Sequence, residues 1–190
     1  MGSSVNQPSP RTLPWEVVER TYRDGAFPIE QGARELWRAA QSDPAADWSQ
    51  LLAAPVVPVC LAIAMGSDSP AAALRQATLE IVRSRQASIA ADIAKRAIVR
   101  SFDEPGEQAA AFAAALFGEA SNYLVSRDLP GHIGPDTRNR TVGEAAAFGD
   151  AVRSRVEQVV RSIPLPQEAA RPETWRGYVA AAAGRLRGAS

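Results

Sequence analysis

Alanine fills 37 of the 190 positions of this chain, and 14 prolines separate the alanine-containing segments from one another. Alanine is the strongest helix former because its side chain loses no rotamer freedom on folding. Proline breaks a helix interior but fits the first helical position, where its missing N–H would have no partner. The combination predicts a series of short, closely packed helices, many of them opened by a proline.

The spacing of the larger apolar residues predicts an all-α, multi-helix bundle of about seven or eight helices with no sheet. Helices opened by Pro14 and Pro28 form a hairpin around a turn at Asp24–Gly25, and Asp43–Pro44 caps a third helix. Residues 1–12 are polar and rich in serine and proline, which predicts a disordered tail. Residues 13–190 are expected to form a single helical domain, in which residues 13–54 hold the hairpin and the third helix and residues 55–190 hold the main bundle.

Three long helices, near residues 70–102, 107–127 and 142–163, are expected at the centre of the bundle. Large apolar residues surround the first of them, a pattern typical of a helix contacted from several sides, and a kink is expected near residues 84–88. Thr141 and Glu144 match the capping box that opens a helix. A short buried helix starting at Pro58 and a last helix opened by Pro172 complete the predicted bundle.

The formal net charge is zero, from 21 basic and 21 acidic residues. This balance argues against a protein that holds nucleic acid or an anionic membrane through a bulk positive field. Basic residues between Arg75 and Arg100 outnumber acidic ones by four, but they lie at many angles around the helix. Nucleic-acid binding through these cations is therefore kept as the third hypothesis only.

The longest apolar run, Ala53 to Met65, contains two prolines and is shorter than the roughly 20 residues that span a bilayer. No basic segment followed by an apolar one opens the chain, so we expect no signal peptide, no membrane partner and a cytoplasmic location. Cys60 is the single cysteine, which excludes an internal disulfide and a cysteine-based metal cluster. We expect Cys60 to be a small buried hydrophobe, and we expect neither a metal nor a cofactor.

Residues 126–141 form the one internal stretch that does not read as a helix, and it is too long for an ordinary helix connection. His132, the only histidine, could act as a general base oriented by Asp128 or Asp136 while an arginine holds an anionic substrate. The same residues also suit a contact surface, and we favour that interpretation. The candidate residues of this stretch are Arg127, Asp128, His132, Asp136, Arg138 and Arg140.

Four tryptophans, Trp15, Trp37, Trp48 and Trp175, lie towards the two ends of the chain. In a chain so rich in alanine they are the largest hydrophobic side chains that can fasten the terminal helices to the bundle. Alternatively one of them, with Trp175 the best candidate, contacts a partner helix or a second copy of the chain.

These observations favour a non-enzymatic helical protein–protein interaction module: an adaptor, a regulatory subunit or a self-assembling protein. Its expected partner is another protein, a second copy of the chain, or both. The second hypothesis is an enzyme or small-ligand binder that uses the loop at residues 127–140, for which His132 is the catalytic candidate.

Overall fold

A computed structural model of the chain describes residues 13–26, 28–42, 47–103 and 107–188. In these ranges the chain forms nine α-helices, one short 3-10 helix and no strand, so the all-α prediction is confirmed. The elements are α1 (Leu13–Arg23), α2 (Ile29–Ser42), α3 (Trp48–Leu52), α4 (Val56–Met65), α5 (Pro70–Ser84), α6 (Ile89–Ser101), α7 (Gln108–Asp128), η1 (Leu129–His132), α8 (Val142–Arg161) and α9 (Pro172–Leu186).

Local side chains explain where several of these helices begin. The Ser69 hydroxyl accepts a hydrogen bond from the backbone N–H of Ala72 ahead of α5. At α8 the predicted capping box is confirmed, because Thr141 accepts from the Glu144 N–H and the Glu144 carboxylate accepts from the Thr141 N–H. Two predictions, the disordered tail at 1–12 and the cap at Asp43–Pro44, lie outside the described residues. As described, α3 begins at Trp48, and the Asp47 carboxylate caps it by accepting a hydrogen bond from the Ser49 N–H.

The segment predicted as one helix over 70–102 is two helices. α5 ends at Ser84, and Arg85 adopts a left-handed conformation (φ 55°, ψ 35°) that turns the chain. The Ser88 hydroxyl then caps α6 by accepting a hydrogen bond from the Ala91 N–H. The kink expected near residues 84–88 is therefore a complete break. The predicted central position holds for α6, whereas α5 lies at the edge of the bundle and packs on α4 and α6.

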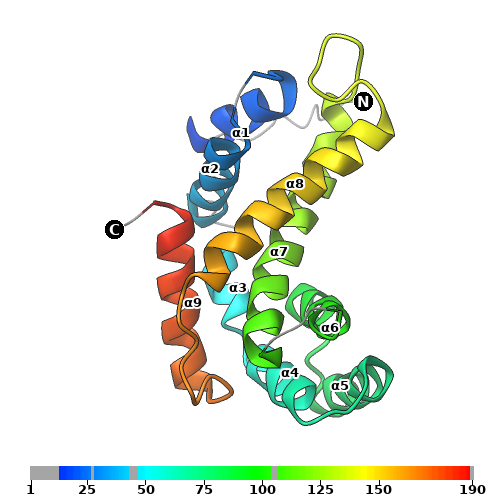
Figure 1. The fold of residues 1–190 in the computed structure, drawn as a ribbon, viewed down its shortest axis with the longest axis vertical. Helices are drawn as coiled ribbons and strands as arrows, with labels where there is room; N and C mark the ends of the chain where they lie inside the picture. The colour runs from blue at the N-terminus through cyan, green and yellow to red at the C-terminus, as the bar shows by residue number, and fades with distance from the viewer. Residues whose placement is uncertain (1–12, 27, 43–46, 104–106, 189–190) are drawn as a thin grey trace, which may run out of the picture.

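The middle of the molecule is α7, which packs against α8, α6, α4 and α2 (Figure 1). Every residue from 111 to 121 is buried, and small side chains on all sides let the neighbouring helices approach closely. The largest buried side chains in the middle of α7 are those of Phe112, Leu116 and Phe117. One hydrophobic cluster includes residues of all nine α-helices. Along it, α1 and α2 lie at one end of the molecule and α4, α5 and α6 at the other (Figure 1).

The tryptophans whose side chains are described belong to the core. Trp37 donates its indole N–H to the Ser121 hydroxyl at 3.0 Å, and Trp175 donates to the Leu52 carbonyl at 2.8 Å. These bonds fasten α2 to α7 and α9 to α3. Trp175 is fully buried, so in this structure it joins the chain's own helices and has no surface to offer a partner. Trp48 is also buried, and the side chain of Trp15 lies outside the described part.

Candidate functional site

The stretch at residues 126–141 is attached to the end of α1 through Arg138. Its guanidinium donates to the Thr21 carbonyl at 2.9 Å and to the Gly25 carbonyl at 3.0 Å, and its backbone N–H donates to the Arg23 carbonyl at 2.8 Å. The last carbonyls of a helix have no partner within the helix, and a cation beside them is favourable. Arg138 therefore acts as a side-chain cap for α1.

A ring contact strengthens this attachment. The Arg138 guanidinium lies 5.1 Å from the ring centroid of Phe148 on α8, within the range of a cation–π interaction. Burial lowers the pKa of Arg138, and the nearby Asp24 carboxylate opposes this effect. The side chain thus links α1, the loop and α8.

His132 takes part in the same attachment. Its Nδ1 accepts a hydrogen bond from Arg23 Nε at 3.3 Å, and its ring centroid lies 5.5 Å from that of Tyr22. The imidazole is therefore held against α1 by a guanidinium and a phenol ring. These contacts give His132 a structural role, in which it holds the loop against α1. A catalytic role for His132 stays a prediction.

The remaining candidate residues of the loop divide into two groups. Arg127 is exposed at the last turn of α7, where Asp128 ends the helix with a side chain outside the described part. Asp136 and Arg140 are exposed, and together with Arg138 they line a depression of about 580 Å³. The lining is Arg23, Gly25, Pro135, Asp136, Thr137, Arg138, Arg140 and Glu144. The loop thus brings three of its predicted site residues together, and Trp175 lies elsewhere, in the core.

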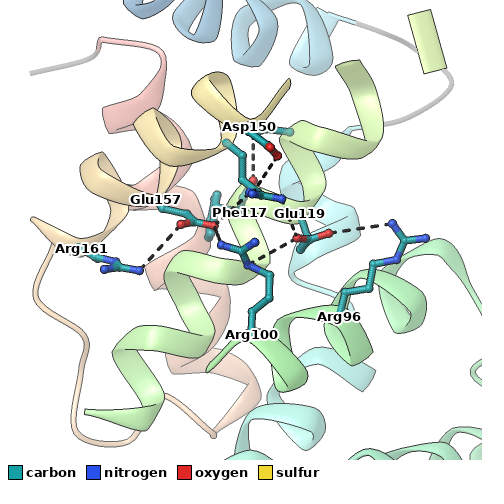
Figure 2. Close-up of polar contacts among 9 residues, drawn as sticks. Arg96, Arg100, Phe117, Glu119, Asp150, Glu157 and Arg161 are labelled. Carbon is teal, nitrogen blue, oxygen red and sulfur yellow. Dashed lines mark hydrogen bonds and ion pairs between the residues drawn. The ribbon is translucent and has the colours of Figure 1, made fainter. Parts of the chain in front are cut away.

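A buried ion-pair cluster at the junction of α6, α7 and α8 has no counterpart in the sequence prediction (Figure 2). Glu119 and Glu157 are each 6% exposed. Arg100 joins them, because its Nη2 donates to Glu157 Oε1 at 2.8 Å and its Nε lies 3.6 Å from Glu119 Oε1. Arg153 lies 3.9 Å from the same two oxygens.

Three further charges surround this cluster. Arg96 lies 4.0 Å from Glu119 and Arg161 lies 3.9 Å from Glu157, on opposite sides of the core of the cluster (Figure 2). Asp150 pairs with Arg153 at 2.9 Å. A buried carboxylate is tolerated when it is paired in this way. The geometry describes a joint between three helices, in which both carboxylates are held by arginines.

One sequence signal could have located this cluster. Glu119 is the single charged residue between Gln108 and Leu124, in a segment otherwise apolar or small on all sides. Acidic residues are almost never buried without a partner, so a lone glutamate in such a helix predicts an arginine on a neighbouring helix. Gly118 completes the arrangement, because a Cβ added there would lie 2.6 Å from Glu157 Oε1.

Most of the exposed large hydrophobic residues of the described part lie on the helices at the opposite end of the molecule from α1 (Figure 1). Among the described residues seven large hydrophobic side chains are at least 40% exposed, and six of them belong to α4, α5 and α6. Single exposed hydrophobic residues are ordinary, whereas these six lie on three helices that pack against one another. We call this the α4–α6 surface; it comprises Val59, Met65, Leu79, Val82, Ile89 and Val99.

Cys60 and the possible metal ligands of the described ranges form no further site. Burial raises the pKa of the Cys60 thiol to about 11, against a smaller opposing effect of Lys95, so the thiol is neutral and unreactive near pH 7. In the described ranges no three His, Cys, Asp or Glu side chains lie close enough to hold a metal ion. Across the same ranges, none of the helices has both the length and the apolar character needed to cross a bilayer. Comparison with family models, with curated proteins and with solved structures finds no match to this chain.

Proposed function

We propose that this protein is a non-enzymatic helical module that binds another protein through the α4–α6 surface. One observation carries the proposal: Leu79 and Val82 are 63% and 70% exposed on a helix whose opposite side already packs on the molecule. Leaving such side chains in water forgoes roughly 1.5–3 kcal/mol each relative to full burial. A protein partner that covers them would recover part of that free energy.

Two further observations support a binding role over catalysis. His132 is held between Arg23 and Tyr22, and the Cys60 thiol is buried with a pKa of about 11. The histidine and the cysteine are thus both used for packing. The interaction surface proposed here differs from the loop favoured by the sequence, because Arg138 of that loop is bonded to its own chain.

Affinity capture from a lysate of the source organism tests the proposal. The wild-type chain should retain a specific protein that the double variant Leu79→Asp/Val82→Asp does not retain. Val142→Asp is the matched control, because Val142 is 75% exposed on α8, away from the α4–α6 surface. No specific protein, together with a strictly monomeric mass in solution, would contradict the proposal.

A second candidate function is the binding of a small anion at the depression beside Arg138. Three arginines (Arg23, Arg138 and Arg140) line it against two acidic residues, Asp136 and Glu144. A ligand that binds the folded state raises its melting temperature. Millimolar inorganic phosphate should therefore raise the melting temperature of the wild type but not of Arg140→Ala, and equal responses would remove this candidate.

A further inference from the structure

Only one narrow side of α5 packs against the rest of the molecule. Its buried residues are Ala73, Ala77 and Ile81, which repeat every fourth position on the side that faces α4 and α6. At 3.6 residues per turn, Leu79 and Val82 lie about 140–160° around the helix axis from Ala77. α5 is therefore apolar on two opposite sides, which is typical of a helix with two packing partners. The part of the chain that the structure describes supplies a partner for one side only.

The charges around this surface are predominantly positive. α5 and α6, with the turn between them, carry six basic and two acidic residues, although the whole chain has no net charge. Arg96 and Arg100 pair with the carboxylates of the buried cluster. Arg83 and Lys95 pair with Glu80 and Asp92 on their own helices. Arg75 and Arg85 have no ion pair with any described residue. Both are exposed on or directly after α5.

We propose that the outer face of α5, with α6 beside it, docks an acidic amphipathic helix of a partner protein. This inference rests on the proposed function and names the class of partner. The apolar stripe of such a helix covers Leu79 and Val82, in the manner of helix-in-groove recognition. Its carboxylates then lie near Arg75 and Arg85, and this complementarity favours the acidic partner over a basic one.

Other occupants fit the same surface less well. A two-fold dimer through α5 would bring Arg75, Arg83 and Arg85 of both copies together, which is repulsive. A membrane surface is usually bound by a helix with aromatic residues and a wide apolar face, and α5 and α6 contain no aromatic residue. Nucleic acid would match the cations but would leave Leu79 and Val82 uncovered.

The test uses designed peptides of about 20 residues, long enough to be helical when bound. The first has leucines at helical i, i+3, i+4 and i+7 positions and glutamates elsewhere. The second replaces each glutamate with lysine, and the third keeps the composition of the first but scrambles the leucines. Each is titrated into the uniformly ¹⁵N-labelled full chain, and amide chemical shifts report both the affinity and the location of binding.

We expect the first peptide alone to bind, with shifts concentrated on α5 and α6. Leu79→Asp/Val82→Asp should weaken binding at least about tenfold, as loss of a central contact does. Arg75→Glu/Arg85→Glu should weaken it and remove most of its dependence on salt. The matched controls are Val142→Asp and Arg176→Glu, whose altered residues are exposed on α8 and α9. Both controls should bind like the wild type.

Several outcomes would overturn the inference. These are equal binding of the glutamate and lysine peptides, shifts centred away from α5, or no binding of the first peptide at millimolar concentration. Co-sedimentation with vesicles of phosphatidylglycerol that Leu79→Asp/Val82→Asp abolishes would reassign the surface to a membrane. A dimer in sedimentation that the same variant dissociates would reassign it to a second copy. If the peptides fail while lysate capture still depends on Leu79 and Val82, the proposed function stands and only the acidic class of partner is wrong.

Discussion

Gly118 lies where α7 passes closest to the carboxylate of Glu157, and its missing side chain makes the buried ion-pair cluster possible. A methyl group there would lie 2.6 Å from Glu157 Oε1 and 3.0 Å from Arg153 Cγ. Gly118→Ala should therefore displace Glu157 from Arg100 and lower the free energy of unfolding by about 1–3 kcal/mol, the range for overpacked sites. Urea denaturation at pH 7 measures the change.

The matched control for this substitution is Gly177→Ala. Gly177 is exposed on α9 and an added Cβ there meets nothing within 4 Å. Because alanine is the better helix former, this variant should gain about 0.5–1 kcal/mol. A Gly118→Ala variant as stable as Gly177→Ala would show that the cluster tolerates the methyl group and would contradict the prediction.

At the level of elements, the break between α5 and α6 depends on Arg85. Its left-handed conformation (φ 55°) is one that glycine adopts without steric cost. Arg85→Gly should therefore raise the free energy of unfolding by about 0.5–1 kcal/mol. Ser88→Ala, which removes the cap of α6, should lower it by about 1 kcal/mol. A destabilised Arg85→Gly variant would mean that contacts of the arginine side chain add more to stability than glycine gains by relieving the left-handed conformation.

The loop at residues 126–141 is an element whose main contact is Arg138. Arg138→Ala removes two hydrogen bonds to the end of α1 and the contact with Phe148, and should cost about 1–3 kcal/mol. Hydrogen exchange should accelerate in α1 and α2 more than in α7. Arg140→Ala, at an exposed neighbour, should change stability by less than about 0.5 kcal/mol. If hydrogen exchange accelerates equally in all helices, Arg138 stabilises the whole fold and does not specifically hold α1 to the loop.

These elements also show how far the sequence determines the structure. The capping box of Thr141 and Glu144 acts over three residues, so the chain alone is enough to predict it. The chain alone does not predict the position of α5, because apolar residues on all sides suit both a central helix and an edge helix with one uncovered side. Arg138 shows the same limit at the candidate site: the sequence identifies the residue, but its partners Thr21 and Gly25 lie more than a hundred positions away.

At the scale of the whole molecule, the two ends of the bundle differ in what they leave exposed. Near α1, arginines and carbonyls bond to one another and the loop is held against the chain. Near α5, hydrophobic side chains face outward amid unpaired cations. The buried cluster of Glu119 and Glu157 lies between these ends and fixes α6 to α7 and α8. It therefore ties α6 to the core, and a surface held in place in this way would lose less conformational entropy on binding the proposed partner.

The core as a whole should make the fold sensitive to alkali. Burial raises the pKa of Cys60 from 9.0 to about 11 and that of Tyr178 from 10.0 to about 12. Both groups are neutral when protonated, and their pKa values are lower in the unfolded chain. The unfolded chain therefore loses these protons first, so a rising pH stabilises it relative to the folded chain. Their effect on stability is absent below about pH 9 and grows through pH 9–11 for Cys60 and pH 10–12 for Tyr178.

The expected result is a free energy of unfolding that is constant between pH 7 and 8.5 and then falls as the pH rises further. Each group contributes at most about 2–3 kcal/mol, reached only above its folded-state pKa. Tyr178→Phe should flatten the decline above pH 10, and Cys60→Ala should flatten its earlier part. Urea denaturation at half-unit pH intervals, compared with each variant, measures both. If Tyr178→Phe loses stability with rising pH as steeply as the wild type, the Tyr178 phenol is exposed to water. That result would contradict the burial of Tyr178 between α9 and the core.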